Sequence, residues 1–280
     1  MADITAAMVA KLREITNVGM MDCKKALTEC KGDLDASVDF LRKKGMATAA
    51  KKASRSAKDG VIAQCIQPGA KVGILLEVNC ETDFVAKNDT FRAFCDEAAR
   101  TLAANPTADL EAVRVAQVSK IGENIKIARM QRFEVSGNGA VAAYIHTGAK
   151  VGVLVEVAAG KEASTQTEEF KQVVKDVTLQ IAAASPVSVS RENVDPAAIA
   201  KEKEIAAEQV KNKPAGVVEK IVAGKLDKFY QTVCLLEQGF VKQNGEITVR
   251  EHLAAVSKTL GDELTVRRFV RFQVGEEFNG

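Results

Sequence analysis

The side chains that could carry chemistry in this sequence are few and dispersed. Its 280 residues include two histidines, His146 and His252, and six cysteines, and none of these stands at a nucleophile or zinc-ligand spacing. The sequence also lacks the glycine-rich dinucleotide motif, the P-loop, the G-x-S-x-G motif and the H-E-x-x-H motif. We therefore expect no catalytic residues and no enzyme. The remaining enzymatic alternative needs a reactive cysteine of low pKa.

A metal or redox role is not indicated either. The cysteines, at positions 23, 30, 65, 80, 95 and 234, form no C-x-x-C pair, so we expect reduced, mostly buried thiols of a cytosolic protein. Glu81, Asp83 and Asp89 could suggest a calcium loop, but the central glycine and the final glutamate of such a loop are lacking. We expect neither a bound metal nor a cofactor.

One loop, residues 79–89, combines acidic side chains with Phe84 and has two interpretations. In the first, Asn88 or Asp89 caps the following helix, and Phe84 or Val85 folds back onto that helix as an apolar staple. In the second, Phe84 is held out beside a carboxylate for a partner. The sequence leaves both open.

An internal repeat shows what positions this loop. The segment Gly69–Val78 returns as Gly148–Val157, at an offset of 79 residues and with eight of ten positions identical. Each copy follows a short alternating segment across a glycine-containing turn, which predicts a β-hairpin. The chain then runs through Thr82, Asp83 and Phe84 in the first copy but through Lys161, Glu162 and Ala163 in the second. The shared fold does not require this difference.

The repeat extends beyond the hairpin. Each hairpin precedes a helix that ends at a proline, Pro106 or Pro186. A second match, Gly122–Val135 with Gly261–Val274, has an offset of 139 residues, so the second unit holds about 60 extra residues. Each unit is predicted to be a hairpin, two helices and a last strand, which form an antiparallel three-stranded sheet covered on one face by helices. The fold class is therefore α+β.

The flanking segments are predicted to be helical. Ile4, Met8 and Leu12 recur at helical spacing in the first of three short helices. Farther along the chain, two runs of apolar residues at helical spacing meet at Pro214 and predict a helical hairpin. This hairpin cannot bury both faces, so it packs against another chain or on the core. The predicted divisions are a three-helix module at 1–45, a basic linker at 46–58, core unit 1 at 59–140, core unit 2 at 141–186 and 229–280, and an inserted hairpin at 187–228.

Composition and charge exclude several classes. The formal charge is +2, with 46% hydrophobic and 27% charged residues, which is typical of globular proteins. Residues 42–58 hold seven basic and no acidic side chains, which favours either a solvated helix or tether, or a phosphate-binding patch for RNA. The longest apolar run, Val72–Val78, contains Glu77 and cannot span a membrane. The N-terminus carries no import or secretion signal, so we expect a cytoplasmic protein.

Three motifs carry a resemblance to a known family. They are G-M-M-D-C-K-K-A-L at 19–27, E-V-N-C-E-T-D-F-V-A at 77–86 and K-I-G-E-N-I at 120–125. In these motifs, and collinearly over essentially the whole chain, the sequence resembles translation elongation factor Ts. The resemblance implies a guanine-nucleotide exchange factor that binds elongation factor Tu with GDP, displaces magnesium and promotes GDP release so that GTP can bind.

The resemblance also implies roles for particular residues. The loop of Thr82, Asp83, Phe84 and Val85 would enter the partner near its magnesium site and dislodge the ion. The N-terminal module is similar to ubiquitin-associated domains and would contact the partner, and the hairpin at 187–228 corresponds to a dimerisation region. No direct nucleic-acid binding is implied, whereas the alternative function is an RNA-binding translation protein that uses residues 42–58. Further candidate partner contacts are Leu12, Met20, Met21 and His146.

Overall fold

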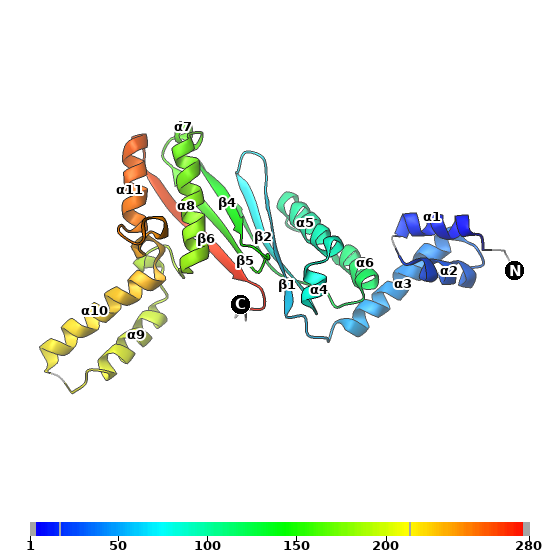
Figure 1. Cartoon of the computed structure of the whole chain (residues 1–280), viewed down its shortest axis with the longest axis horizontal. Helices are drawn as coiled ribbons and strands as arrows, with labels where there is room; N and C mark the ends of the chain where they lie inside the picture. The colour runs from blue at the N-terminus through cyan, green and yellow to red at the C-terminus, as the bar shows by residue number, and fades with distance from the viewer. Residues whose placement is uncertain (1–3, 17, 213, 277–280) are drawn as a thin grey trace.

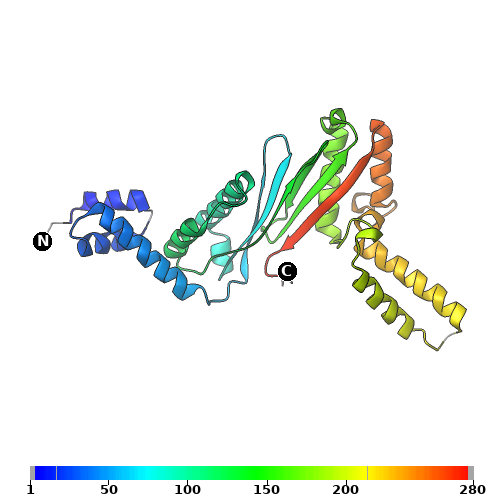
Figure 2. The ribbon, with the colours of Figure 1, turned by 180° about the vertical axis from the view of Figure 1, so that it is seen from behind.

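Two small sheets lie between a helical module at one end of the molecule and a helical hairpin at the other (Figures 1 and 2). This computed structural model describes residues 4–16, 18–212 and 214–276. Helices and two antiparallel three-stranded sheets share the chain, which confirms the predicted α+β class.

Three helices form the N-terminal module around a small apolar core. Leu12, Cys23 and Leu27 each have 0% of their surface exposed in this core. Asp33 caps the third helix by accepting a hydrogen bond from the Ala36 N–H at 2.9 Å, because the first turn of a helix leaves its N–H groups without backbone partners. The helices are α1 (Ala6–Thr16), α2 (Met20–Glu29) and α3 (Leu34–Lys52).

Helix α3 extends beyond the predicted end of the three-helix module. It continues through the predicted boundary between residues 45 and 46 and ends at Lys52, so the first half of the predicted linker is helical. It packs against α6 (Glu111–Ile121) of the first core unit. The two helices approach closely at Gly45, where an added Cβ would lie 3.0 Å from Ser119 Oγ. A continuous helix therefore joins the module to the core.

The two core units repeat one order of elements. In each, a β-hairpin leads into a helix of four residues, a long helix, a further helix and a last strand. The first unit comprises β1 (Asp59–Ile66), β2 (Val72–Cys80), α4 (Asp83–Ala86), α5 (Asp89–Ala104), α6 and β3 (Lys126–Glu134). The second comprises β4 (Gly139–Ile145), β5 (Val151–Ala159), α7 (Glu162–Thr165), α8 (Glu168–Ala184), α11 (Val249–Leu260) and β6 (Leu264–Gln273).

Each sheet is covered on both faces, which explains its apolar central strand. The strand orders are β1-β2-β3 and β4-β5-β6, with every pairing antiparallel. Along β2, Ile74 and Leu76 pack with the helices of their own unit, whereas Leu75 packs against Leu154 of the other sheet. Strands buried on both faces read as continuous apolar runs rather than alternating ones. The molecule is therefore layered as helices, sheet, sheet, helices.

Reciprocal contacts join the two sheets. Ile62 N–H donates to the Ala149 carbonyl at 2.7 Å, and Val141 N–H donates to the Ala70 carbonyl at 2.8 Å. These are the same contact made twice, with the units exchanged. Cation–π contacts follow the same symmetry, because an arginine of each last strand lies over a phenylalanine of the other: Arg129 over Phe272 at 4.2 Å, and Arg268 over Phe133 at 4.4 Å. The repeat in sequence is thus a pseudo-twofold repeat in space.

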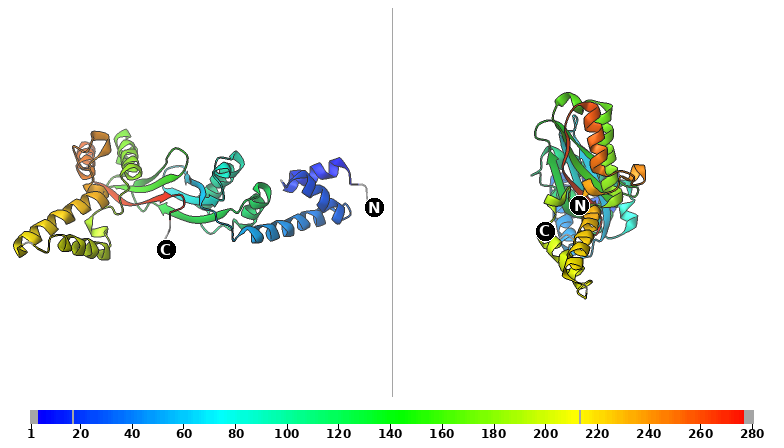
Figure 3. Two further views of the ribbon diagram at one scale, coloured as in Figure 1. Left: turned by 60° about the horizontal axis from the view of Figure 1, so that its bottom comes forward. Right: turned by 90° about the vertical axis from the view of Figure 1, so that its left-hand side faces the viewer.

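The inserted hairpin projects away from the second unit (Figure 3). Its helices are α9 (Pro196–Glu208) and α10 (Ala215–Val233), which pack on each other. The returning helix continues past the predicted boundary at residue 228. Exposed apolar side chains include Ile205 and Val217, at 42% and 43% exposure. Three short 3₁₀ helices flank this region: Arg191–Asn193, Leu235–Glu237 and Val241–Gln243.

Candidate functional site

Phe84, the aromatic side chain of the candidate loop, is carried by helix α4, directly after β2. Phe84 is 82% exposed, whereas Ala86 in the same turn is 2% exposed. Val85 is half-buried and packs against the core of the first unit. Of the two interpretations of this loop, the structure therefore excludes Phe84 as the staple and leaves Val85 in that position. This exposure leaves Phe84 accessible to a partner.

A carboxylate from a distant turn holds the start of this loop. Glu123 accepts hydrogen bonds from the N–H groups of Glu81 and Thr82, at 3.0 and 3.1 Å, and from the Thr82 hydroxyl at 2.7 Å. Thr82 is also the N-cap of α4, where its hydroxyl oxygen accepts from the Val85 N–H at 3.4 Å. One side chain thus fixes both residues that precede α4.

The contact between the turn and the loop is reciprocal. Glu81 accepts a hydrogen bond from the Asn124 N–H at 2.6 Å, next to Glu123 in the chain. The Asn124 side chain is 1% exposed and donates to the carbonyls of Ala53 and Arg55, at 3.3 and 2.9 Å. The same turn therefore binds the Phe84 loop on one side and the segment after α3 on the other.

The far end of α4 is fixed by local contacts. Asp83 accepts from Lys87 Nζ at 2.6 Å, one helical turn away, in a pair that is exposed to solvent. Asn88 caps α5 by accepting from the N–H groups of Thr90 and Phe91, at 2.9 and 3.3 Å, which confirms the predicted cap. The Asp83 carboxylate is thus already paired within the loop.

The second unit has the same scaffold without the aromatic side chain. There α7 occupies the place of α4, and Asp262 occupies the place of Glu123 and accepts from the Lys161 N–H at 2.9 Å. At the repeat offset of 79 residues, the position of Phe84 is taken by Ala163. The scaffold is therefore common to both units, and Phe84 is the specific addition in the first.

Comparison with known proteins identifies the family. The family model described as elongation factor TS matches residues 81–276. Elongation factor Ts of Symbiobacterium thermophilum is 45% identical over 99% of this chain and 93% of that protein. The proteins of the same name from Nautilia profundicola and Clostridioides difficile are each 45% identical over 99% of this chain and 94% of their own length.

The chain belongs to the elongation factor Ts family. It is accordingly a translation elongation factor, which confirms the resemblance seen in the three sequence motifs.

Of the module residues considered for this family member, two are exposed and one is buried. Met20 and Met21 begin α2 with 58% and 77% exposure, so both are open to a partner. Leu12 has 0% exposure in the core of the module and cannot touch a partner in this conformation. The expectation that Leu12 contacts a partner does not hold. Leu12 belongs to the apolar face of α1, and this face packs between the three helices of the module.

His146 lies in the exposed turn between β4 and β5, and its Nδ1 is 3.0 Å from the Tyr144 hydroxyl. The same turn reaches the first unit, where Lys150 Nζ binds the Asp59 carboxylate and donates to the Gly60 carbonyl at 2.8 Å. Burial opposes ionisation of Asp59, but the hydrogen bonds from Lys150 and from its neighbour's N–H hold the pKa of that carboxyl below its ordinary value. The turn is thereby attached to the end of β1 that pairs with Cys80, two residues before Thr82.

The cysteines lie in the described part of the chain and are all free thiols. Four are buried: Cys23, Cys80, Cys95 and Cys234. Burial raises the pKa of the Cys80 thiol to about 12, with a contribution from the nearby Glu123 and Asp59 charges. A thiol of this kind is protonated at neutral pH and is a poor nucleophile.

Metal sites and membrane-spanning helices are two further features that residues 4–16, 18–212 and 214–276 could contain. In those ranges, no group of three or more histidine, cysteine or acidic side chains is arranged to hold a metal ion. None of the helices described there combines the length and the apolar character needed to cross a membrane.

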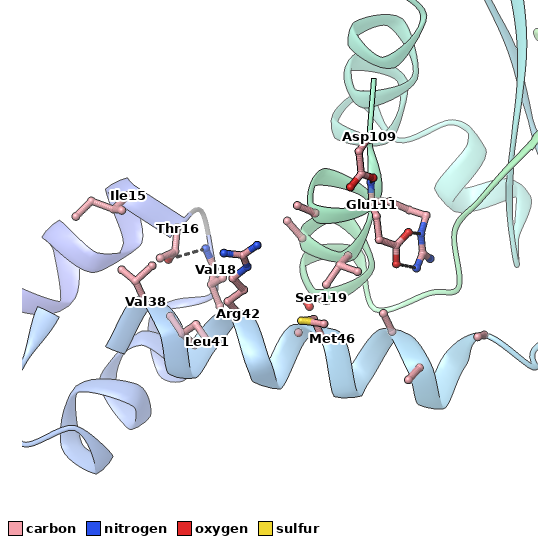
Figure 4. A pocket seen from close by; sticks show the side chains of 18 residues that line it. Ile15, Thr16, Val18, Val38, Leu41, Arg42, Met46, Asp109, Glu111 and Ser119 are labelled. Atoms are coloured by element: carbon pink, nitrogen blue, oxygen red, sulfur yellow. Dashed lines mark hydrogen bonds and ion pairs between the residues drawn. The ribbon is translucent and has the colours of Figure 1, made fainter. Parts of the chain in front are cut away.

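An apolar groove of about 580 Å³ lies where the module meets the core (Figure 4). Leu41 and Met46 of α3 line one side, and Glu111, paired with Arg114 at 2.6 Å, stands on α6 at the other. The module therefore meets the first unit chiefly through the α3–α6 contact, and the groove remains open beside it.

The sequence reasoning missed the role of Glu123. Its segment belongs to a family motif and to the repeat, but neither pattern assigns Glu123 to the Phe84 loop. A usable signal was present, since the repeat places an acidic residue, Asp262, at the equivalent position. What the sequence does not show is that the side chains of Glu123 and Asp262 reach loops 42 and 101 residues earlier in the chain.

Proposed function

We propose that this chain is a guanine-nucleotide exchange factor that binds elongation factor Tu with GDP, displaces magnesium and promotes GDP release so that GTP can bind. The observation that carries the proposal is Phe84, which is 82% exposed on a short helix whose start is held by three hydrogen bonds. Membership of the elongation factor Ts family supports the choice of partner.

The proposed mechanism requires no covalent chemistry from this chain. A magnesium ion bridges the nucleotide phosphates to a GTPase, so a side chain that shifts the ligands of this ion weakens nucleotide binding. Thr82 to Val85 would insert as a wedge, with Phe84 as its apolar tip. The buried, protonated Cys80 supports a non-enzymatic role, because it removes the nearest thiol as a nucleophile.

Free-energy coupling indicates that the wedge does not act alone. A factor that weakens nucleotide binding about 10⁴-fold must itself bind about 5.5 kcal/mol less tightly when the nucleotide is present. Burial of one phenylalanine supplies roughly 1.5 to 3 kcal/mol. Other surfaces must therefore hold the factor on its partner, and exposed Met20, Met21 and His146 are the proposed further contacts.

Release of a fluorescent GDP analogue from elongation factor Tu tests this proposal directly. The GTPase is loaded with the analogue, an excess of unlabelled GDP is added, and release is followed with increasing amounts of the chain. Release should accelerate to a plateau. A release rate that is independent of the chain at all concentrations would refute the exchange function.

The RNA-binding alternative is less well supported. Among the basic side chains of residues 42–58, Lys44 pairs with Asp22 at 2.6 Å, Lys52 Nζ donates to the Gly122 carbonyl, and Arg55 lies 3.6 Å from Glu81. These cations serve contacts within the protein. Steeply salt-dependent RNA binding that is lost on neutralising Lys43 and Lys51 would favour the alternative.

We also propose that residues 187–228 pair with a second copy of the chain and that the factor acts in the cytoplasm, where its proposed partner works. The exposed apolar side chains of the hairpin support self-association.

A further inference from the structure

We propose that Glu123 is a positioning residue, which holds the Phe84 loop in the conformation that acts on the partner. This inference rests on the proposed exchange function and adds to it. Glu123 does not share the exposed position of Phe84, because it is half-buried beneath the loop. It would act through the backbone that carries Phe84 rather than by contact with the partner.

The loop needs such a support because its own structure is short. Helix α4 has four residues, and a single helical turn is not stable by itself in water. The residues just before it donate three hydrogen bonds to the single carboxylate of Glu123, at 2.7 to 3.1 Å. Hydrogen bonds to a charged acceptor are stronger than those between neutral groups. Glu123 therefore accepts three of the hydrogen bonds that restrain the start of α4.

The same turn ties the loop to helix α3. Asn124 donates to the carbonyls of Ala53 and Arg55, and Lys52 Nζ donates to the Gly122 carbonyl. Arg55 in turn lies 3.6 Å from Glu81. The turn at 122–124 thus connects the base of the Phe84 loop to the end of the helix that begins in the N-terminal module.

Fixing the loop should affect the maximal rate of GDP release rather than the binding of the factor. If the loop adopts its active conformation for only a fraction of the time, the effectiveness of the wedge falls by that fraction. The remaining interface is unchanged, so the factor still binds. Loss of Glu123 should therefore lower the maximal rate of GDP release while leaving the half-saturating concentration of the factor nearly constant.

The second unit provides a matched control. Asp262 makes the equivalent contact with the Lys161 N–H, but the short helix that it supports carries Ala163 where the first unit carries Phe84. Asp262→Ala removes the same kind of restraint from a loop without the aromatic tip. It should leave the maximal exchange rate within about twofold of the unmodified protein, as distant independent sites do.

The experiment compares Glu123→Ala, Glu123→Gln, Asp262→Ala, Phe84→Ala and the double variant Phe84→Ala/Glu123→Ala by release of the GDP analogue. Glu123→Ala should lower the maximal rate roughly tenfold. Glu123→Gln retains one acceptor oxygen, so its maximal rate should lie between those of the unmodified protein and Glu123→Ala. In the Phe84→Ala background, Glu123→Ala should change the rate by less than about twofold, because its effect passes through Phe84.

Amide hydrogen exchange of the free protein gives a second readout that does not depend on nucleotide release. The amides of Glu81 and Thr82 should exchange roughly tenfold faster in Glu123→Ala, with no change in the amides of the two sheets. If Glu123→Ala does not fold, Glu123→Gln serves for both measurements.

Three results would overturn the inference. They are an unchanged maximal rate in folded Glu123→Ala, an equal loss in Asp262→Ala, and an undiminished loss in the Phe84→Ala background. Should the unmodified chain fail to accelerate GDP release, the exchange function falls first. Unchanged protection of the Glu81 and Thr82 amides would then reject the restraint itself, and lost protection would retain it as a property of the loop.

Discussion

At the scale of single residues, the exposed phenylalanine carries the main prediction. Phe84→Ala should slow release of the GDP analogue by about 10- to 100-fold, which corresponds to the roughly 1.5 to 3 kcal/mol that burial of this side chain supplies. Binding of the factor should weaken less, because other surfaces hold the complex. Stopped-flow release and a separate binding titration measure the two effects.

The control for this variant is Val241→Ala. Val241 is 42% exposed and lies in the 3₁₀ helix Val241–Gln243 of the second unit, away from the Phe84 loop. Its truncation should change neither the release rate nor the binding. Release that is unchanged in Phe84→Ala would remove the wedge role even if the chain still bound its partner.

A second prediction at this scale concerns thiol reactivity. Burial raises the pKa of Cys80 to about 12 and raises that of Cys95 as well, so raising the pH from 7 to 9 generates little thiolate at either position in the folded protein. Half-buried Cys30 and Cys65 should be alkylated first by iodoacetamide, and Cys80 and Cys95 only on unfolding in urea. Mass spectrometry of tryptic peptides reads the order. Rapid labelling of Cys80 at pH 7 would revive the case for a reactive cysteine.

At the scale of elements, the repeated glycines let the two sheets approach. A Cβ at Gly73 would lie 2.6 Å from Val141 Cγ1 in the other unit, and valine has little rotamer freedom to yield. Gly73→Ala should therefore lower the free energy of unfolding by about 1 to 3 kcal/mol, the usual effect of overpacking. Urea unfolding followed by circular dichroism measures this change.

The matched control lies in the hairpin. Gly224 is exposed in the interior of α10, with nothing within 4 Å of an added Cβ. Gly224→Ala should raise helix stability by roughly 0.5 to 1 kcal/mol, since alanine is the better helix former. Equal effects of the two substitutions would contradict the role assigned to Gly73.

At the scale of the whole molecule, the projecting hairpin predicts self-association. Sedimentation should show a concentration-dependent dimer. The double variant Ile205→Glu/Val217→Glu should shift it to monomer, because each substitution replaces an exposed apolar side chain, 42% and 43% exposed, with a charged one. The control is Lys203→Glu, at an exposed polar position of α9, the helix that carries Ile205. A chain that stays monomeric at every concentration would contradict the proposed dimer.

The arrangement of the whole molecule also gives the exchange mechanism its geometry. The Met20–Met21 surface and the Phe84 loop belong to different units, which α3 and the turn at 122–124 connect through hydrogen bonds from Asn124 to the carbonyls of Ala53 and Arg55. Such a connection lets binding at one surface contribute at the other, because less ordering entropy is lost when the second contact forms.

Much of this protein was determined by the sequence itself. The repeat predicted two equivalent units and their order of elements, since the spacing of apolar residues is a local property that helices and strands follow directly. The difference between Phe84 and Ala163 singled out the loop, and three motifs indicated the family. Asn88 as a cap followed from short-range hydrogen bonding.

Only the tertiary structure decided which side chains face solvent. Phe84 is exposed and Leu12 buried, although both are apolar residues on helices, because the packing of neighbouring elements rather than local periodicity selects the covered face. The same holds for Glu123, whose role depends on a turn brought to the end of β2 by the pairing of β2 with β3. Contacts between segments distant in the chain follow from how the sheets and helices close on one another, and no local pattern encodes that closure.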